Sequence, residues 1–162
     1  GEASYTYRHA LLRDTAYGSI GRHRRAELHV RFARWIRGLP TPLGTELAGT
    51  HLAVAHDVLP ATSAGLDDGT TAADLAREAA ALLAGAAEAS MVAAPQRAAA
   101  LLSHALGLPA GTGAERLARR LDLAEALRRS GDVALALEAF SNAAEQALAR
   151  DDEESLVTAA VG

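Results

Sequence analysis

Apolar residues recur every three or four positions along most of this chain, with polar residues between them. That period is typical of α-helices that bury one face. Glycines, prolines and short polar runs interrupt the pattern and predict where each helix ends. The predicted helices approximately cover residues 9–18, 22–37, 43–59, 72–92, 95–106, 113–130 and 133–150, and a further helix begins after Arg150.

The first residues follow a different pattern. Tyr5, Tyr7 and His9 alternate with Thr6 and Arg8, and a period of two residues is typical of a strand. No partner strand is predicted in the rest of the chain. We therefore expect this short strand to pair with a segment of a longer protein that lies outside these 162 residues.

The second predicted helix carries bulky apolar residues on one side. Leu28, Phe32, Leu39 and either Trp35 or Ile36 are spaced three or four positions apart. We expect these side chains to form one buried stripe. Burial of this stripe argues against the use of the helix as an exposed recognition helix for DNA.

Composition narrows the fold class. Hydrophobic residues make up 49% of the 162 positions but aromatic residues only 4%, so alanine and leucine supply most of the apolar mass. Such a chain builds its core from many close contacts between helices, and its β-branched residues are too scattered for a sheet. We expect an all-α protein with one short N-terminal strand.

The absence of cysteine excludes disulfides, thiolate zinc sites and cysteine nucleophiles. The longest apolar run, at 79–87, is too short to cross a bilayer. The first residues do not have the pattern of a signal peptide, and we expect none. We expect a cytoplasmic location and no membrane partner.

The stretch GLPTPLG at 38–44 contains two prolines and two glycines and is the strongest candidate for a domain boundary. Residues 1–40 contain eight arginines and three acidic residues, whereas residues 41–162 contain eight arginines and seventeen acidic residues. This difference in charge indicates two units, at 1–40 and 41–162.

Local signals predict several helix ends. The stretch PATSAGLDDGTT at 60–71 is predicted to be a loop. Thr71 is expected to cap the helix that follows, and Asp132 the helix that follows the turn at Gly131. The acidic residues at 151–154 suit the positive end of the last helix.

Residues 124–143 repeat small and large side chains at spacings similar to those of a tetratricopeptide repeat, and a weaker copy lies 38 positions earlier. In such repeats small residues let paired helices approach closely, while large residues fill the groove between them. The resemblance implies antiparallel helix hairpins over 41–162, stacked as a tetratricopeptide-like right-handed solenoid that continues beyond the chain's last residue. The residues expected to pack these hairpins are Ala98, Leu102, Ala105, Ala124, Leu127, Gly131, Ala136, Phe140 and Ala143.

The opening stretch YTYRHALLRDTAYGSIGRHRRAELHVRFARWI resembles a segment found just after the ATPase core of bacterial signal-transduction ATPases of the STAND class. The matching residues are Tyr5, Tyr7, His9, Leu12, Arg13, Asp14, Tyr17, Arg24, Arg25, Leu28 and His29. The family includes LuxR-type transcriptional regulators and adenylate-cyclase-linked proteins, and a tetratricopeptide-like sensor follows this segment. The resemblance implies that residues 1–40 are the tail of a winged-helix-like module beside the ATPase, and that residues 41–162 begin the sensor.

The resemblance also implies partners and candidate sites. The partners are the ATPase domain of the same polypeptide, with its ATP or ADP and Mg²⁺, and a protein or small-molecule effector on the helical array. His9 is a candidate nucleotide-sensing residue; the alternative is a histidine whose ring bonds to a backbone carbonyl. Arg13, Arg22, Arg24 and Arg25 are candidates for the surface that docks on the ATPase or another partner.

We expect no bond chemistry, no bound cofactor and no metal in this chain. The sequence has neither the phosphate-binding motif GxxxxGK[ST] nor a lysine with which to build one. His51 and His56 are five positions apart and fall on different faces of a helix, which does not suit a metal site. Ser19 lies near His23 and Asp14 but without a nucleophile elbow.

Together with the absence of catalytic motifs, the resemblance implies a non-enzymatic helical sensor segment of a multidomain STAND-class ATPase, a bacterial transcriptional regulator, that relays effector binding to the nucleotide switch. Two alternatives stay open. One is a stand-alone tetratricopeptide adaptor that binds a partner peptide. The other is a nucleic-acid-binding domain that uses the arginines at 22–37, although direct nucleic-acid contact is not expected.

Overall fold

The computed structural model describes residues 10–39, 41, 43–60 and 62–162, with side chains from Asp14 onward. Within these residues the fold is all-α, as the composition predicts, with eight helices and no strand. The strand predicted at 5–9 lies outside the described residues. The helices are α1 (Ala10–Ser19), α2 (Arg22–Arg37), α3 (Gly44–Val58), α4 (Ala72–Ser90), α5 (Pro95–Gly107), α6 (Gly113–Ser130), α7 (Val133–Leu148) and α8 (Glu153–Val161).

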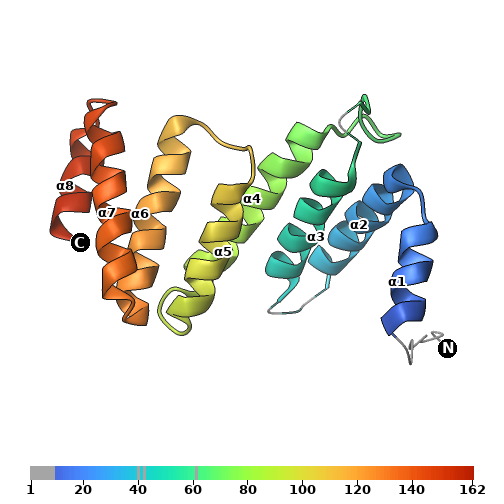
Figure 1. Cartoon of the computed structure of the whole chain (residues 1–162), viewed down its shortest axis with the longest axis horizontal. Coiled ribbons are helices and arrows are strands. Elements are labelled where there is room, and N and C mark those ends of the chain that lie inside the picture. Colours follow the sequence, from blue (N-terminus) through green and yellow to red (C-terminus); the bar gives the residue numbers. More distant parts are fainter. Residues whose placement is uncertain (1–9, 40, 42, 61) are drawn as a thin grey trace.

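The helices follow one another in a row, with α1 at one end and α8 at the other (Figure 1). From α2 onward each helix packs against the next helix of the chain, and α6 also contacts α8. The two ends of the described chain are therefore far apart, and most contacts join neighbours in the sequence.

Local signals mark the helix ends as expected. Thr71 Oγ1 accepts a hydrogen bond from Asp74 N at 3.2 Å, and Asp74 Oδ2 accepts one from Thr71 N at 3.1 Å, which completes a capping box at α4. Pro95 lies in the first turn of α5, where its missing N–H costs nothing. Gly131 ends α6 with φ 88°, a left-handed conformation that glycine adopts without steric penalty.

The predicted cap of α7 is wrong in part. Asp132 occupies the N-cap position, but its side chain makes no capping hydrogen bond. Its carboxylate instead accepts a hydrogen bond from Ser130 Oγ at 2.9 Å. Because the Asp132 carboxylate bonds to Ser130, α7 begins without a side-chain cap.

The apolar side chains form two cores. The first core spans α2 to α5 and includes Ala126 of α6. The second core joins α6, α7 and α8 around Phe140. Alanine is the commonest residue in both, and in the described part of the chain no polar or charged residue is buried. Small side chains at these positions let the helices lie close together.

Most residues predicted to pack the repeats are buried, namely Ala98, Leu102, Ala105, Ala124, Ala136, Phe140 and Ala143. Leu127 differs from the prediction. It is only partly buried and packs against the first core, not against the second core that contains Phe140. Gly131 is exposed at the turn between α6 and α7.

The stripe predicted to be buried on α2 is largely wrong. Leu28, Trp35 and Leu39 are exposed, and 57% of Trp35 is accessible. The helix has a second stripe of smaller residues, and this stripe is the one that packs. It consists of Ala26, Val30, Ala33 and Ile36. Smaller side chains allow α2 and α3 to approach closely, and the bulky residues are left on the other side of α2.

Candidate functional site

The structure describes only part of the predicted partner surface. His9 and the side chain of Arg13 lie outside the described residues. Arg22 Nε donates a hydrogen bond to Val58 O at 3.1 Å and so ties the start of α2 to the end of α3. This arginine therefore has a role inside the chain.

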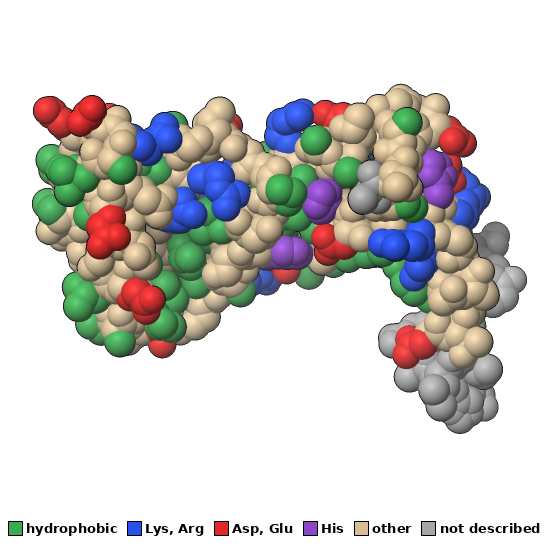
Figure 2. Space-filling model, turned by 45° about the horizontal axis from the view of Figure 1, so that its top comes forward, with side chains coloured by type: hydrophobic (Ala, Val, Ile, Leu, Met, Phe, Trp, Pro, Cys, Tyr) green, Lys and Arg blue, Asp and Glu red, His purple; other side chains and the backbone are tan. Residues whose placement is uncertain are grey.

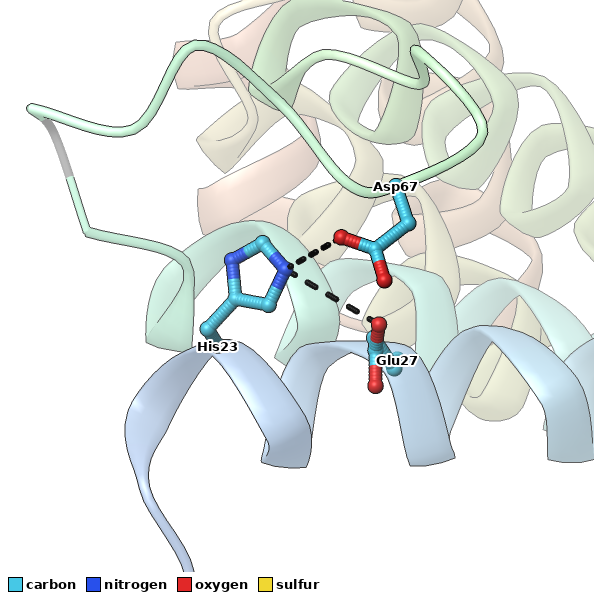
Figure 3. A group of neighbouring side chains, drawn as sticks. All are labelled: His23, Glu27 and Asp67. Carbon is cyan, nitrogen blue, oxygen red and sulfur yellow. Dashed lines mark ion pairs between the residues drawn. The ribbon is translucent and has the colours of Figure 1, made fainter.

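Three side chains converge where α2 meets the loop between α3 and α4 (Figure 3). His23 and Glu27 are four residues apart and share one face of α2, and the loop brings Asp67 to the same place. His23 Nε2 lies 3.8 Å from Glu27 Oε1 and 3.5 Å from Asp67 Oδ1. Arg24 donates to the other oxygen of Glu27 at 2.6 Å. The Arg24 hydrogen bond is the main cause that lowers the pKa of Glu27.

The His23–Glu27–Asp67 cluster has the donor atoms that a divalent ion such as Zn²⁺ accepts, within 4.8 Å of one another. Arg24, Arg31 and Arg34 line the adjacent cavity of about 150 Å³. Their positive charges disfavour a second cation at this point. The arrangement suits direct ion pairing between the loop and α2 better than metal binding.

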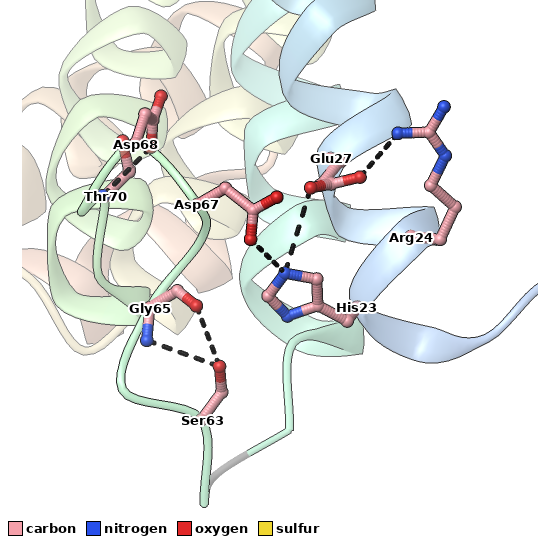
Figure 4. Close-up of polar contacts among 8 residues, drawn as sticks. All are labelled: His23, Arg24, Glu27, Ser63, Gly65, Asp67, Asp68 and Thr70. Atoms are coloured by element: carbon pink, nitrogen blue, oxygen red, sulfur yellow. Dashed lines mark hydrogen bonds and ion pairs between the residues drawn. The ribbon is translucent and has the colours of Figure 1, made fainter.

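The loop itself is held by its own polar groups (Figure 4). Ser63 Oγ donates to Gly65 O at 2.9 Å and accepts from Gly65 N at 3.3 Å. Asp68 accepts from Thr70 N at 3.0 Å and from Arg34 at 2.9 Å. The hydrogen bonds from Thr70, followed by that from Arg34, lower the pKa of Asp68 to about 2. The loop is thus anchored to α2 at two acidic residues.

A second polar cluster joins α1, α2 and α3. Tyr17 Oη lies 2.8 Å from His29 Nε2, and His29 Nδ1 lies 2.8 Å from His51 Nδ1. The Phe32 ring packs on His51 with centroids 4.2 Å apart, and the Arg25 guanidinium lies 5.0 Å from the centre of the Tyr17 ring. Burial lowers the pKa of His51 and is also the main cause that lowers the pKa of His29.

Two concavities lie on either side of α6. One, of about 610 Å³, lies between α4, α5 and α6. The other, of about 670 Å³, lies between α6, α7 and α8. Both are lined by Asp122 and Glu125, so α6 forms a ridge between them. On the end of the molecule formed by α7 and α8, hydrophobic side chains gather at the surface (Figure 2, left).

Sequence reasoning missed both polar clusters. The spacing of four residues between His23 and Glu27 was readable, but the approach of Asp67 depends on the path of the loop. In the same way, His29 and His51 are 22 positions apart and meet only because α2 packs on α3. His56 bonds to Ala72 O at 2.9 Å, away from His51.

Within the described residues, no helix combines the length and the hydrophobicity needed to cross a membrane. No protein-family model, no curated protein and no solved structure matches this chain.

Proposed function

We propose that this chain is a non-catalytic helical sensor segment of a multidomain bacterial ATPase of the STAND class, with a transcriptional regulator as the parent protein. In this proposal the hairpins α4–α5 and α6–α7 stack as a tetratricopeptide-like right-handed solenoid, and an effector binds to one face of it. The observation that carries the proposal is the serial packing of each helix on the next through alanine. Small shifts between such neighbours are a route by which a bound effector changes a distant domain.

The exposed face of α2 supports a contact with another domain. Leu28 and Trp35 are exposed and seven positions apart, so they share the side of α2 away from the packed stripe, and Leu39 is exposed just after the helix ends. An exposed tryptophan flanked by leucines is typical of a protein contact. In the proposal this face docks on the ATPase domain of the same polypeptide, which binds ATP or ADP with Mg²⁺.

The charges of α2 support this reading over nucleic-acid binding. Three arginines of the helix form ion pairs with carboxylates: Arg24 with Glu27, Arg34 with Asp68 and Arg37 with Glu78. Arginines that already have carboxylate partners gain less from phosphates. The same helical array would also suit a stand-alone adaptor. The two functions differ in whether the polypeptide also carries an ATPase domain.

The complete reading frame gives the first test. The proposal expects a GxxxxGK[ST] motif upstream of Gly1, in a domain that binds ATP. A reading frame without this motif would support the adaptor.

The second test measures the release of a fluorescent ADP analogue from the complete protein. Trp35→Ala is expected to change the release rate, because it removes the centre of the docking face. Val133→Ala is the matched control, since Val133 is 69% exposed on α7 at the other end of the row. Identical rates for the wild type and both variants would contradict the role of the α2 face.

A further inference from the structure

The cavity between α4, α5 and α6 combines an apolar floor with an acidic rim. Leu102 is buried beneath it, and Met91 lies half-buried at its side. Glu88 of α4 and Asp122 of α6 are exposed and line the same cavity. The concavity of about 610 Å³ is large enough for one or two side chains of a bound peptide.

The two rim carboxylates lack a cation. Within the described part of the chain, neither the Glu88 nor the Asp122 carboxylate forms an ion pair or a hydrogen bond. Desolvation by the surrounding protein atoms raises the pKa of Asp122, and the charge of Glu88 raises it further. Because both carboxylates line the same cavity, their like charges repel one another.

The neighbouring carboxylate shows the contrast. Glu125 also lines the cavity, but it accepts hydrogen bonds from Arg128 at 2.7 Å and from Arg129 at 2.5 Å. Its charge is therefore balanced from its own helix. The charge left for a ligand comes from Glu88 and Asp122.

We infer that this cavity binds a peptide segment of a partner protein through an arginine or lysine placed next to an apolar side chain. The inference rests on the proposed function and names the chemistry of the effector. The cationic group lies between Glu88 and Asp122 and removes their repulsion. The apolar side chain covers Met91 and Leu102 and is withdrawn from water.

Charge and shape together select this occupant. A nucleic acid is repelled by the same two carboxylates. A metal ion gains nothing from the apolar floor, and within the described residues Glu88 and Asp122 belong to no group of three side chains that could ligate one. A basic peptide uses both the rim and the floor.

The chain provides its own reporter for the test. Met91 is the single methionine of the sequence, so labelling methionine methyl groups with ¹³C gives one NMR signal from inside the cavity. The probe is a short synthetic peptide of alternating arginine and leucine. The comparison peptide has citrulline, which is neutral and nearly the same shape, in place of each arginine. On the wild-type chain, the arginine peptide is expected to shift the Met91 signal, and the citrulline peptide is expected to bind at least about tenfold more weakly.

A pair of matched variants locates the charge. The double variant Glu88→Gln with Asp122→Asn is expected to bind the arginine peptide about tenfold more weakly, or weaker still, than the wild type does. The control, Glu138→Gln with Glu145→Gln, removes the same charge from exposed positions of α7 that do not line the cavity. It is expected to bind like the wild type.

Three results would overturn the inference: no shift of Met91 with the arginine peptide, equal binding of both peptides, or equal weakening by both double variants. None of these results bears on nucleotide release in the complete protein, so the inference can fail while the proposed function stands. Conversely, a reading frame without a phosphate-binding motif removes the ATPase but not the peptide site.

Discussion

At the scale of single residues, a hydrogen bond between the His29 and His51 rings joins α2 to α3. One Nδ1 donates to the other across 2.8 Å, and Tyr17 bonds to the far nitrogen of His29. The pair holds together when both rings are neutral or when one is protonated. When both rings are protonated, two N–H groups face each other and the contact is lost.

This geometry predicts how stability depends on pH. The folded chain lowers the pKa of both histidines from the ordinary value of 6.5, so the unfolded chain binds protons more readily. Their contribution to stability is therefore full above pH 6.5 and is lost as the pH falls below that value. His51→Asn keeps a polar group near Nδ1 but does not titrate. We expect a smaller loss of melting temperature between neutral and mildly acidic pH in this variant than in the wild type.

His104→Asn is the control for that measurement. His104 is exposed on α5 and makes no polar contact within the residues that the structure describes. Its variant is expected to follow the wild-type pH profile. If His51→Asn and His104→Asn gave the same profile, the histidine pair would have no part in acid sensitivity.

At the scale of elements, α2 shows that one helix can carry two apolar stripes and bury only one of them. Trp35 and Ile36 are neighbours in the sequence, yet Trp35 is 57% exposed and Ile36 only 7%. Ile36→Ala is expected to lower the free energy of unfolding by about 2–5 kcal/mol, because it leaves a cavity in the first core. Trp35→Ala is expected to change it by less than about 1 kcal/mol. Urea unfolding of the two variants measures both values, and a larger loss for Trp35→Ala would show that the bulky stripe is the packed one.

The second core depends on small residues at the contact between α6 and α7. Ala143 is fully buried there. Ala143→Leu is expected to overpack this contact and to cost about 1–3 kcal/mol of unfolding free energy. Ala136 is a less sensitive position, because it lines a cavity of about 350 Å³ that has room for part of a larger side chain.

Ala134→Leu is the matched control for this change. Ala134 lies on the same helix but is exposed, so the added side chain meets solvent. Its effect is expected to stay within about 0.5 kcal/mol. Thermal unfolding of both variants makes the comparison, and equal stabilities would contradict close packing at Ala143.

The same elements show what sequence reasoning reaches. The ends of α4, α5 and α6 were predictable because Thr71, Pro95 and Gly131 act within a few residues of themselves. The packed face of α2 was not predictable, since periodicity finds apolar stripes but not which of two will meet a neighbour. The approach of Asp67 to α2 was also beyond reach, because it depends on the course of the loop between α3 and α4.

At the scale of the whole molecule, the two cores divide the row into two parts. The first core is continuous from α2 to α5, and the second joins α6, α7 and α8. The parts meet where α5 packs against α6, with Ala126 of α6 inside the first core. In a row of this kind stability is close to a sum of local terms and neighbour contacts. The parts are therefore expected to open separately.

Hydrogen exchange on the Ala143→Leu variant tests this division. The change weakens the second core by about 1–3 kcal/mol, so amides of α6 to α8 are expected to lose protection by up to the same amount. Helices α2 to α4 contribute no residue to the second core, so their amides are expected to exchange at the wild-type rate. An equal loss of protection along the whole row would show one cooperative unit. In that case an effector bound at α6 would act on α2 through global stability, and local shifts between neighbouring helices would not be needed to carry its effect.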